Sequence, residues 1–251
     1  MGSRIPVSFE LTIIIPILKR DAKLELELTE LCLSLIKSSI NAEIIVISHK
    51  DELHLDSSKY KAITSPTLQR LRAVVTDDQS AKLGRLLRIG TSISDSRFVL
   101  YLIPEGKFDA HFLPKALNLM RAGSSLVFAN RFHDLNIGIH GSRSTFFRQR
   151  ILRRIFSLIG VRNLPKDFTN STRMFDKHFF DGLAISGNNW DMLAEQTVKC
   201  ALVKARIETI DVCVKDFRTE NDFQVQFLEA FLGFCRLLPR TLMHKTIIPW
   251  F

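Results

Sequence analysis

Short apolar runs alternate with longer amphipathic stretches along most of the chain. The short runs have the composition of buried strands, and the longer stretches repeat apolar residues at helical spacing. This alternation is typical of an α/β domain with a largely parallel sheet and crossover helices. Strands are predicted over 10–16, 43–47, 98–103, 125–130 and 207–214, with a weaker one over 71–75, and helices over 21–40, 81–93, 110–120 and 190–203.

The last segment of the chain has a different pattern. Residues 223–251 form an apolar, amphipathic stretch that contains Phe227, Phe231 and Phe234. We therefore expect a main domain over 1–222 and a helical tail over 223–251. An apolar face of this kind is more often core or a dimer surface than a membrane anchor, so a homo-oligomer formed through the tail stays an open alternative.

Composition and charge limit the kinds of molecule that the protein is expected to bind. With 251 residues and 46% hydrophobic content, the chain can bury a sizeable core. Its 35 Lys and Arg against 26 Asp and Glu give a formal charge of +9, which favours anionic partners. No apolar run reaches the roughly 18 to 20 residues of a membrane span and the start lacks a signal-peptide layout, so we expect a cytoplasmic protein. The four cysteines form no CxxC pair and predict neither zinc nor a disulfide framework.

The densest basic segment is 141–166, which holds seven Lys and Arg and no acidic residue. It contains no aromatic platform on a strand, and common nucleic-acid motifs are absent, so nucleic acid is the less favoured partner. Three interpretations remain: a phosphate-binding segment, a solvated helix face, or a helix at an anionic membrane surface. The apolar side that the last interpretation needs would come from Phe146, Phe147, Ile151, Ile155 and Phe156.

Seven segments together resemble family 2 glycosyltransferases of the GT-A fold, nearest to the dolichyl- or polyprenyl-phosphate sugar transferases. Their order and spacing carry the resemblance, which spans roughly residues 10 to 220. The segments are LTIIIP (11–16), EIIVI (43–47), KLGRLLRIG (82–90), FVLYLIPE (98–105) followed by FLP (112–114), SLVFANR (125–131), DFTNSTRMF (167–175) and DMLAE (191–195). The resemblance implies a mostly parallel nucleotide-binding sheet with helices on both faces and an acceptor-side elaboration toward the C-terminus.

On the donor side, the resemblance implies a nucleotide site at the ends of the first two strands. Pro16 closes the first strand, while Ser48 and His49 stand where the family places aspartates that hold the base. Asp51 and Glu52 follow and would substitute for them if the loop shifts. Two arginines further along the chain are expected to face the donor diphosphate: Arg173 and Arg218.

The family's metal-binding Asp-x-Asp is reduced here to Ile103-Pro104-Glu105. Mg²⁺ often takes one or two protein carboxylates together with phosphate oxygens and water, so Glu105 is the expected ligand of Mg²⁺ or Mn²⁺. Asp77-Asp78 resembles the missing Asp-x-Asp motif only in the type of its residues. It is interpreted as a loop with a helix cap near Ser80.

The acceptor side is expected to be basic. An already ionised polyprenyl phosphate needs no strong general base, and arginines supply most of its positioning. These arginines are expected to be Arg131, Arg143, Arg148 and Arg150. The resemblance adds two carboxylates with catalytic roles beside Glu105, namely Asp167 and Glu195; the alternatives are a turn cap for Asp167 and plain surface for Glu195.

The sequence thus predicts a glycosyltransferase that moves a sugar from a nucleotide-sugar donor to an acceptor such as a polyprenyl phosphate, at the inner face of a membrane. The main rival is a catalytically inactive relative that keeps the fold as a binding or scaffold protein, because the aspartates are lost at Ser48-His49 and Ile103. A third interpretation, a basic membrane-peripheral adaptor, rests on charge and on the amphipathic tail alone.

Overall fold

The structure is a computed structural model that describes residues 9–18, 24–49, 69–78, 81–103, 111–130, 150–151, 153–158, 161, 164–168 and 170–212. Seven strands form one sheet. They are β1 Leu11–Ile17, β2 Ala42–His49, β3 Gln69–Thr76, β4 Phe98–Tyr101, β5 Leu126–Asn130, β6 Arg173–Asp176 and β7 Ile207–Asp211. The helices are α1 Leu24–Lys37, α3 Leu83–Ser92, α4 Phe112–Arg121, α6 Lys177–Gly182 and α7 Asp191–Leu202.

The sheet is mixed but mostly parallel, with the strand order β3-β2-β1-β4-β6-β5-β7. β1 pairs in parallel with both β2 and β4, and β5 pairs in parallel with β7. Only β6 runs the other way, because it is antiparallel to β4 and to β5. The predicted α/β class is therefore confirmed, with one reversed strand inserted into a parallel sheet.

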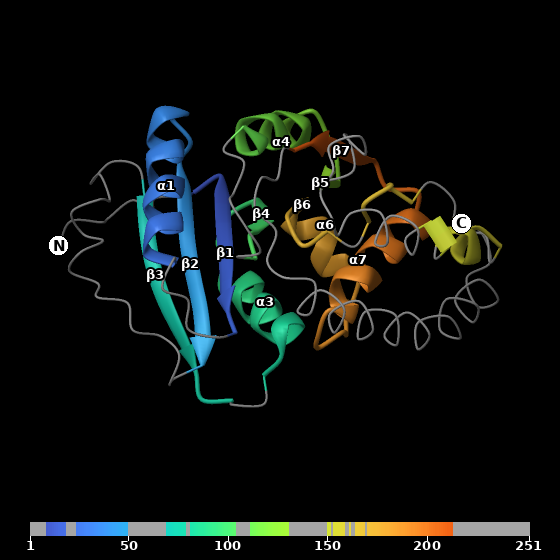
Figure 1. The fold of residues 1–251 in the computed structure, drawn as a ribbon, viewed down its shortest axis with the longest axis horizontal. Helices are drawn as coiled ribbons and strands as arrows, with labels where there is room; N and C mark the ends of the chain where they lie inside the picture. Colours follow the sequence, from blue (N-terminus) through green and yellow to red (C-terminus); the bar gives the residue numbers. More distant parts are fainter. Residues whose placement is uncertain are drawn as a thin grey trace, which may run out of the picture.

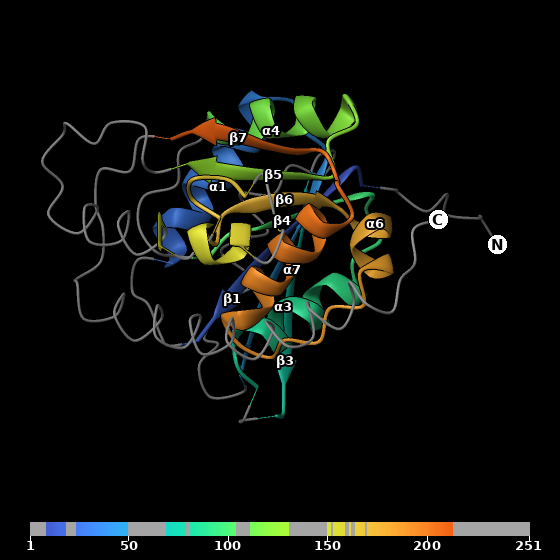
Figure 2. The same cartoon turned by 90° about the vertical axis from the view of Figure 1, so that its right-hand side faces the viewer.

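Helices cover both faces of this sheet (Figures 1 and 2). On one face α1 and α4 contribute Leu31, Leu35 and Phe112 to a core shared with β1, β2 and β4. On the other face α3, α6 and α7 pack through residues such as Leu86 and Leu193. The strands of the centre are buried on both sides, since every residue of β1 is buried, and this explains their continuous apolar sequences.

The predicted strands and helices are found within a few residues of their expected places. Two elements were not predicted: β6 and the short helix α6 that follows it. The strand predicted over 98–103 ends earlier, at Tyr101. The predicted tail over 223–251 lies outside the described residues.

A further helical stretch, residues 150, 151 and 153–158, is called here the basic helix. Phe156 anchors it in a small third core together with Val161, Leu164 and Phe168, which packs against α7. The rings of Phe156 and Phe168 meet edge to face, with centroids 6.5 Å apart. Within the described chain, no helix is long and apolar enough to cross a membrane.

The structure describes two of the four cysteines, Cys32 and Cys200. Both are buried. Burial raises the pKa of Cys32 to about 11 and that of Cys200 to about 12, which keeps both thiols protonated and unreactive.

Candidate functional site

All strands of the sheet except β6 have their carboxyl ends at the same edge, which is called here the carboxyl edge. Because β5 and β4 are both antiparallel to β6, they are parallel to each other, and β7 follows β5. The chain order reverses between β1 and β4, since β2 and β3 extend the sheet in one direction and the later strands extend it in the other. In α/β sheets ligands bind outside the carboxyl ends of the strands at such a reversal. This edge is therefore the candidate site.

Pro16 and Ser48 lie side by side at this edge, near the ends of β1 and β2. Pro16 pairs with Ile47 and the next residue, Ile17, pairs with Ser48. The Ser48 hydroxyl is buried and donates to the carbonyl of His49 at 3.1 Å. The neighbouring His49 Nδ1 is buried and has no hydrogen-bond partner among the described residues. Asp51 and Glu52 lie outside the described residues.

After β4, the sequence has Ile103-Pro104-Glu105 where the family's Asp-x-Asp motif would stand. Ile103 is only 7% exposed, and its side chain belongs to the core on the α3 face. Glu105, the expected metal ligand, lies outside the described residues. Among the residues that are described, no three His, Cys, Asp or Glu side chains are grouped so that they could hold a metal ion.

The loop between β3 and α3 confirms that Asp78 is part of a turn. Its carboxylate forms an ion pair with Arg85 Nε at 2.9 Å, and its amide donates to the Thr76 hydroxyl. The predicted cap near Ser80 is wrong in detail. The N-cap is Lys82, which makes no side-chain capping bond, and α3 starts at Leu83.

Arg173, expected at the donor diphosphate, lies instead in the interior. It is the first residue of β6, is 0% exposed, and its guanidinium carbon lies 4.6 Å from the centre of the Phe128 ring. Its Nε donates to the carbonyl of Asn170 at 3.0 Å, and its Nη1 donates to the carbonyl of Leu193 at 2.6 Å. Further bonds reach Phe168, Gln196 and Thr197. The guanidinium therefore links the turn before β6 to α7.

Asp167 lies in that turn. It is fully buried, its carbonyl accepts from the Asn170 amide, and its carboxylate lies 3.4 Å from Asn170 Nδ2. The same Asn170 Nδ2 donates to the carbonyl of Ala129 in β5 at 2.5 Å. Asp167 thus contributes to a buried turn that fixes the start of β6 at the carboxyl edge.

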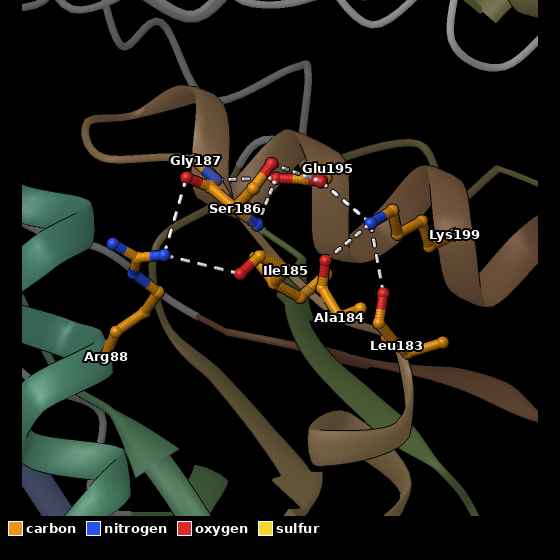
Figure 3. A network of polar contacts seen from close by, with 8 residues as sticks. All are labelled: Arg88, Leu183, Ala184, Ile185, Ser186, Gly187, Glu195 and Lys199. Atoms are coloured by element: carbon orange, nitrogen blue, oxygen red, sulfur yellow. Dashed lines mark hydrogen bonds and ion pairs between the residues drawn. The ribbon is translucent and has the colours of Figure 1, made fainter.

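Glu195 lies on α7 and is 2% exposed, so it is not plain surface. Its carboxylate accepts from the amide of Gly187 at 2.8 Å and from both the amide and the hydroxyl of Ser186 (Figure 3). Lys199, one turn later, completes the set at 2.8 Å. Burial tends to raise the pKa of the Glu195 carboxyl, but the bonds from Lys199, Gly187 and Ser186 outweigh it and hold this pKa below its ordinary value.

Two of the partners of Glu195, Ser186 and Gly187, belong to the α6–α7 loop, residues 183–189. Lys199 Nζ also donates to the carbonyls of Leu183 and Ala184, at 3.0 and 2.9 Å. From the other side, Arg88 of α3 donates to the side chain of Asn188 at 2.5 Å (Figure 3 shows its bonds to the loop carbonyls). The loop is therefore fixed between α3 and α7.

Close packing of backbones accompanies these bonds. The amide of Arg85 donates to the carbonyl of Asn188 at 3.1 Å. A Cβ placed on Gly84 would lie 2.6 Å from the Asn189 carbonyl oxygen and 2.8 Å from other backbone atoms of the loop. Only glycine allows α3 to approach the loop so closely at this position.

We expect Gly84→Ala to lower the free energy of unfolding by about 1 to 2 kcal/mol, because an overpacked backbone contact costs roughly 1 to 3 kcal/mol and the better helix propensity of alanine recovers up to about 1. Urea unfolding measures this change. The matched control is Gly182→Ala in α6, whose added Cβ meets no atom within 4 Å and should leave stability equal or higher. Equal stability of the two variants would contradict the close approach.

Two polar residues at this edge were not predicted to belong to the site. Asn130, the last residue of β5, pairs with Asp211, the last residue of β7. Asn130 Nδ2 donates to Asp211 Oδ1 at 2.5 Å. Asp211 is exposed. Asn130 had a signal in the sequence, because it is the polar last residue of the strand predicted over 125–130, whereas Asp211 lies inside the strand predicted over 207–214.

Five of the six described site residues form two groups. Pro16 and Ser48 lie at the ends of β1 and β2, whereas Asp167, Arg173 and Glu195 lie around β6 and α7. Arg150 is exposed on the basic helix. The other arginines of the prediction lie outside the described residues: Arg131, Arg143, Arg148 and Arg218.

Comparisons with known proteins find similar solved structures but no similar sequences. No protein-family model matches the chain, and no curated protein matches it by sequence. Solved structures do match. Glucosyl-3-phosphoglycerate synthase from Mycobacterium tuberculosis, in complex with Mn²⁺, UDP and phosphoglyceric acid, has a TM-score of 0.61 at 13% identity over 96% of this chain and 80% of its own.

Two more solved structures are similar. The same synthase with Mg²⁺ and UDP matches with a TM-score of 0.61 and 13% identity, over 90% of this chain and 78% of its own. A structure described only as a mycobacterial protein matches with a TM-score of 0.63 and 12% identity, over 90% and 74%. At such identities the likeness concerns the fold. The chain has the mixed α/β sheet of the GT-A glycosyltransferase fold, as the sequence predicted.

Proposed function

We propose that this protein transfers a sugar from a nucleotide-sugar donor bound at the carboxyl edge of the sheet, between the ends of β1, β2 and β4. One observation carries the proposal: the fold of glucosyl-3-phosphoglycerate synthase, crystallised with UDP-glucose and Mn²⁺, extends over 96% of the chain. The order of the sequence motifs supports it. Pro16 and Ser48 lie at the edge where the donor would bind.

The residues proposed for the donor are Ser48, Asp51 and Glu52 for the nucleoside, and Arg218 for the diphosphate. Glu105 would hold Mg²⁺ or Mn²⁺ together with the diphosphate oxygens, as its place in the sequence motif implies. When bound, the metal would neutralise the charge that develops on the leaving diphosphate. Arg173 would contribute from the interior, by fixing the turn that precedes β6.

The proposed step is a direct displacement at the anomeric carbon. The bond from this carbon to the diphosphate oxygen breaks, the nucleoside diphosphate leaves with the electron pair, and an acceptor oxygen forms the new bond. A phosphate acceptor is already an anion, so the step needs no strong base. The acceptor arginines proposed are Arg131, Arg143, Arg148 and Arg150.

The acceptor is proposed to carry a phosphate group, with a polyprenyl phosphate preferred. The similar synthase was crystallised with phosphoglyceric acid, which is also a phosphate-bearing anion. A lipid-linked acceptor would require the protein to work at the inner surface of a membrane. The tail over 223–251 is proposed as the surface for self-association, if the protein is an oligomer.

A catalytically inactive binding protein is the second candidate, and two observations favour it. The Ser48 hydroxyl donates to the carbonyl of His49, and the side chain of Ile103 is buried in the core. Neither side chain carries the negative charge that an aspartate would bring to a donor site. In this alternative the fold persists as a scaffold.

Calorimetric titration with UDP and GDP, with and without Mn²⁺, separates the two candidates. We expect metal-dependent binding of one nucleotide, which Glu105→Ala weakens at least about tenfold, because one of the few carboxylates available to the metal is lost. Glu208→Ala is the matched control, since Glu208 pairs with Arg206 on the surface away from the carboxyl edge. Absence of nucleotide binding under all conditions would favour the scaffold.

A further inference from the structure

The basic helix presents one face that combines cationic and aliphatic side chains. Arg150 and Arg154 are exposed, Ile151 is 43% exposed and Leu158 is 87% exposed. At 3.6 residues per turn these four positions fall within an arc of about 100°. Leu158 and Ile151 therefore place aliphatic surface in solvent beside two arginines, and burying that surface would be favourable.

The opposite side of the helix attaches it to the domain. Phe156 is 1% exposed and packs against Phe168 and, through the third core, against Ala194 and Val198 of α7. The sequence pattern predicts Phe156 on the same apolar side as Ile151. The structure separates them, so that Phe156 anchors the helix while Ile151 and Leu158 face outward.

The charge of the segment identifies the kind of surface that this face fits. Residues 141–166 carry seven basic and no acidic side chains. Cationic groups around exposed aliphatic side chains match an anionic lipid surface, where the arginines meet headgroups and the aliphatic groups enter the upper acyl region. The four described residues of this face include no aromatic ring on which a nucleic-acid base could stack.

We propose that the outer face of the basic helix, formed by Arg150, Ile151, Arg154 and Leu158, docks on an anionic membrane surface. This goes beyond the proposed glycosyl transfer, because docking requires neither a nucleotide nor a working donor site. The helix packs against α7, so docking would bring α7 and the loop before it close to the bilayer surface. A lipid-linked acceptor would then reach the site from that surface.

The test is co-sedimentation of the full chain, without nucleotide, with vesicles of phosphatidylcholine containing about one third phosphatidylserine. We expect the double variant Arg154→Glu/Leu158→Asp to lose binding. Each charge near such a surface changes partitioning roughly fivefold, so reversing Arg154 alone should lower it about 25-fold. The single variant Arg154→Glu keeps the test valid if the double variant fails to fold.

The matched control is Lys115→Glu/Leu33→Asp. It makes the same chemical changes at exposed positions on α4 and α1, which cover the opposite face of the sheet. We expect this control to retain most of the binding. The proposal would be overturned if the two double variants lost binding equally, or if Arg154→Glu/Leu158→Asp bound as well as the wild type. It would also be overturned if the wild type bound equally well to vesicles of pure phosphatidylcholine. Binding of the same face to an RNA oligonucleotide with no binding to vesicles would overturn it as well.

Discussion

Replacing Arg173 with methionine is expected to lower the free energy of unfolding by about 4 kcal/mol or more. Arg173 is fully buried, and its guanidinium donates to both the turn before β6 and α7. Methionine fills part of the volume but donates nothing, so the Asn170 carbonyl and Gln196 Oε1 lose their bonds from this side chain. Each buried polar group left unpaired costs roughly 1 to 3 kcal/mol.

Urea unfolding monitored by fluorescence measures this loss, and Arg173→Lys should recover only part of it because a single ammonium group cannot reach the same set of acceptors. The matched control is Arg206→Met. Arg206 also bonds a backbone carbonyl, that of Ala122, but its side chain is 52% exposed, so we expect a loss below about 1 kcal/mol. If Arg173→Met were as stable as the wild type but no longer bound UDP, the structural role of Arg173 would be contradicted. That result would support the donor contact that the sequence motif implied.

Glu195→Ala is expected to release the α6–α7 loop and to cost about 3 kcal/mol. The carboxylate holds the amides of Ser186 and Gly187, and Gly187 is buried, so its amide would be left without a comparable acceptor (Figure 3). Hydrogen exchange should show the amides of Ser186 and Gly187 exchanging at least about tenfold faster, since these bonds are local. Glu195→Gln keeps one acceptor oxygen and should lie between the wild type and alanine.

The contribution of Glu195 to the free energy of unfolding should be larger at neutral pH than at acidic pH. Its folded-state pKa lies below the ordinary value of 4.5, so the carboxylate stabilises the fold above that value. This stabilisation is lost as the pH falls through the folded-state pKa. The difference in unfolding free energy between wild type and Glu195→Gln should therefore be full near pH 7 and shrink below about pH 4.5.

Asp181→Ala is the control for this comparison, because Asp181 forms an exposed ion pair with Lys177 one turn away on α6. It should cost no more than about 0.5 kcal/mol and leave the loop amides unchanged. If Glu195→Ala instead kept wild-type stability and exchange rates but lost glycosyl transfer, then Glu195 would act on the substrate, as the sequence resemblance implied.

The elements of the central sheet were predictable because their signal is local. β1 and β2 are mostly apolar runs, and the amphipathic period of α3 shows which face meets the sheet. β6 was missed for the opposite reason. Its sequence, Arg-Met-Phe-Asp, is too short to show a period, and it becomes a strand through antiparallel pairing with β4 and β5.

The site was less predictable, because the roles of its charged residues depend on partners far away in the chain. Arg173 and Glu195 were identified as functional from their motifs, yet the motif contains no information on burial. Arg173 receives its acceptors from the turn before β6 and from α7. Asn130 and Asp211 come together only because β5 and β7 are neighbours in the sheet.

The sequence by itself therefore determined the α/β class, the position of most strands and helices, and the concentration of positive charge in 141–166, because periodicity and composition are properties of adjacent residues. Only the tertiary structure decided that Arg173 and Glu195 are enclosed, that the α6–α7 loop is held between α3 and α7, and that Phe156 faces inward while Leu158 faces outward. These outcomes depend on contacts between distant segments, since the cost of burying a charge or a polar group is set by the partners that surround it.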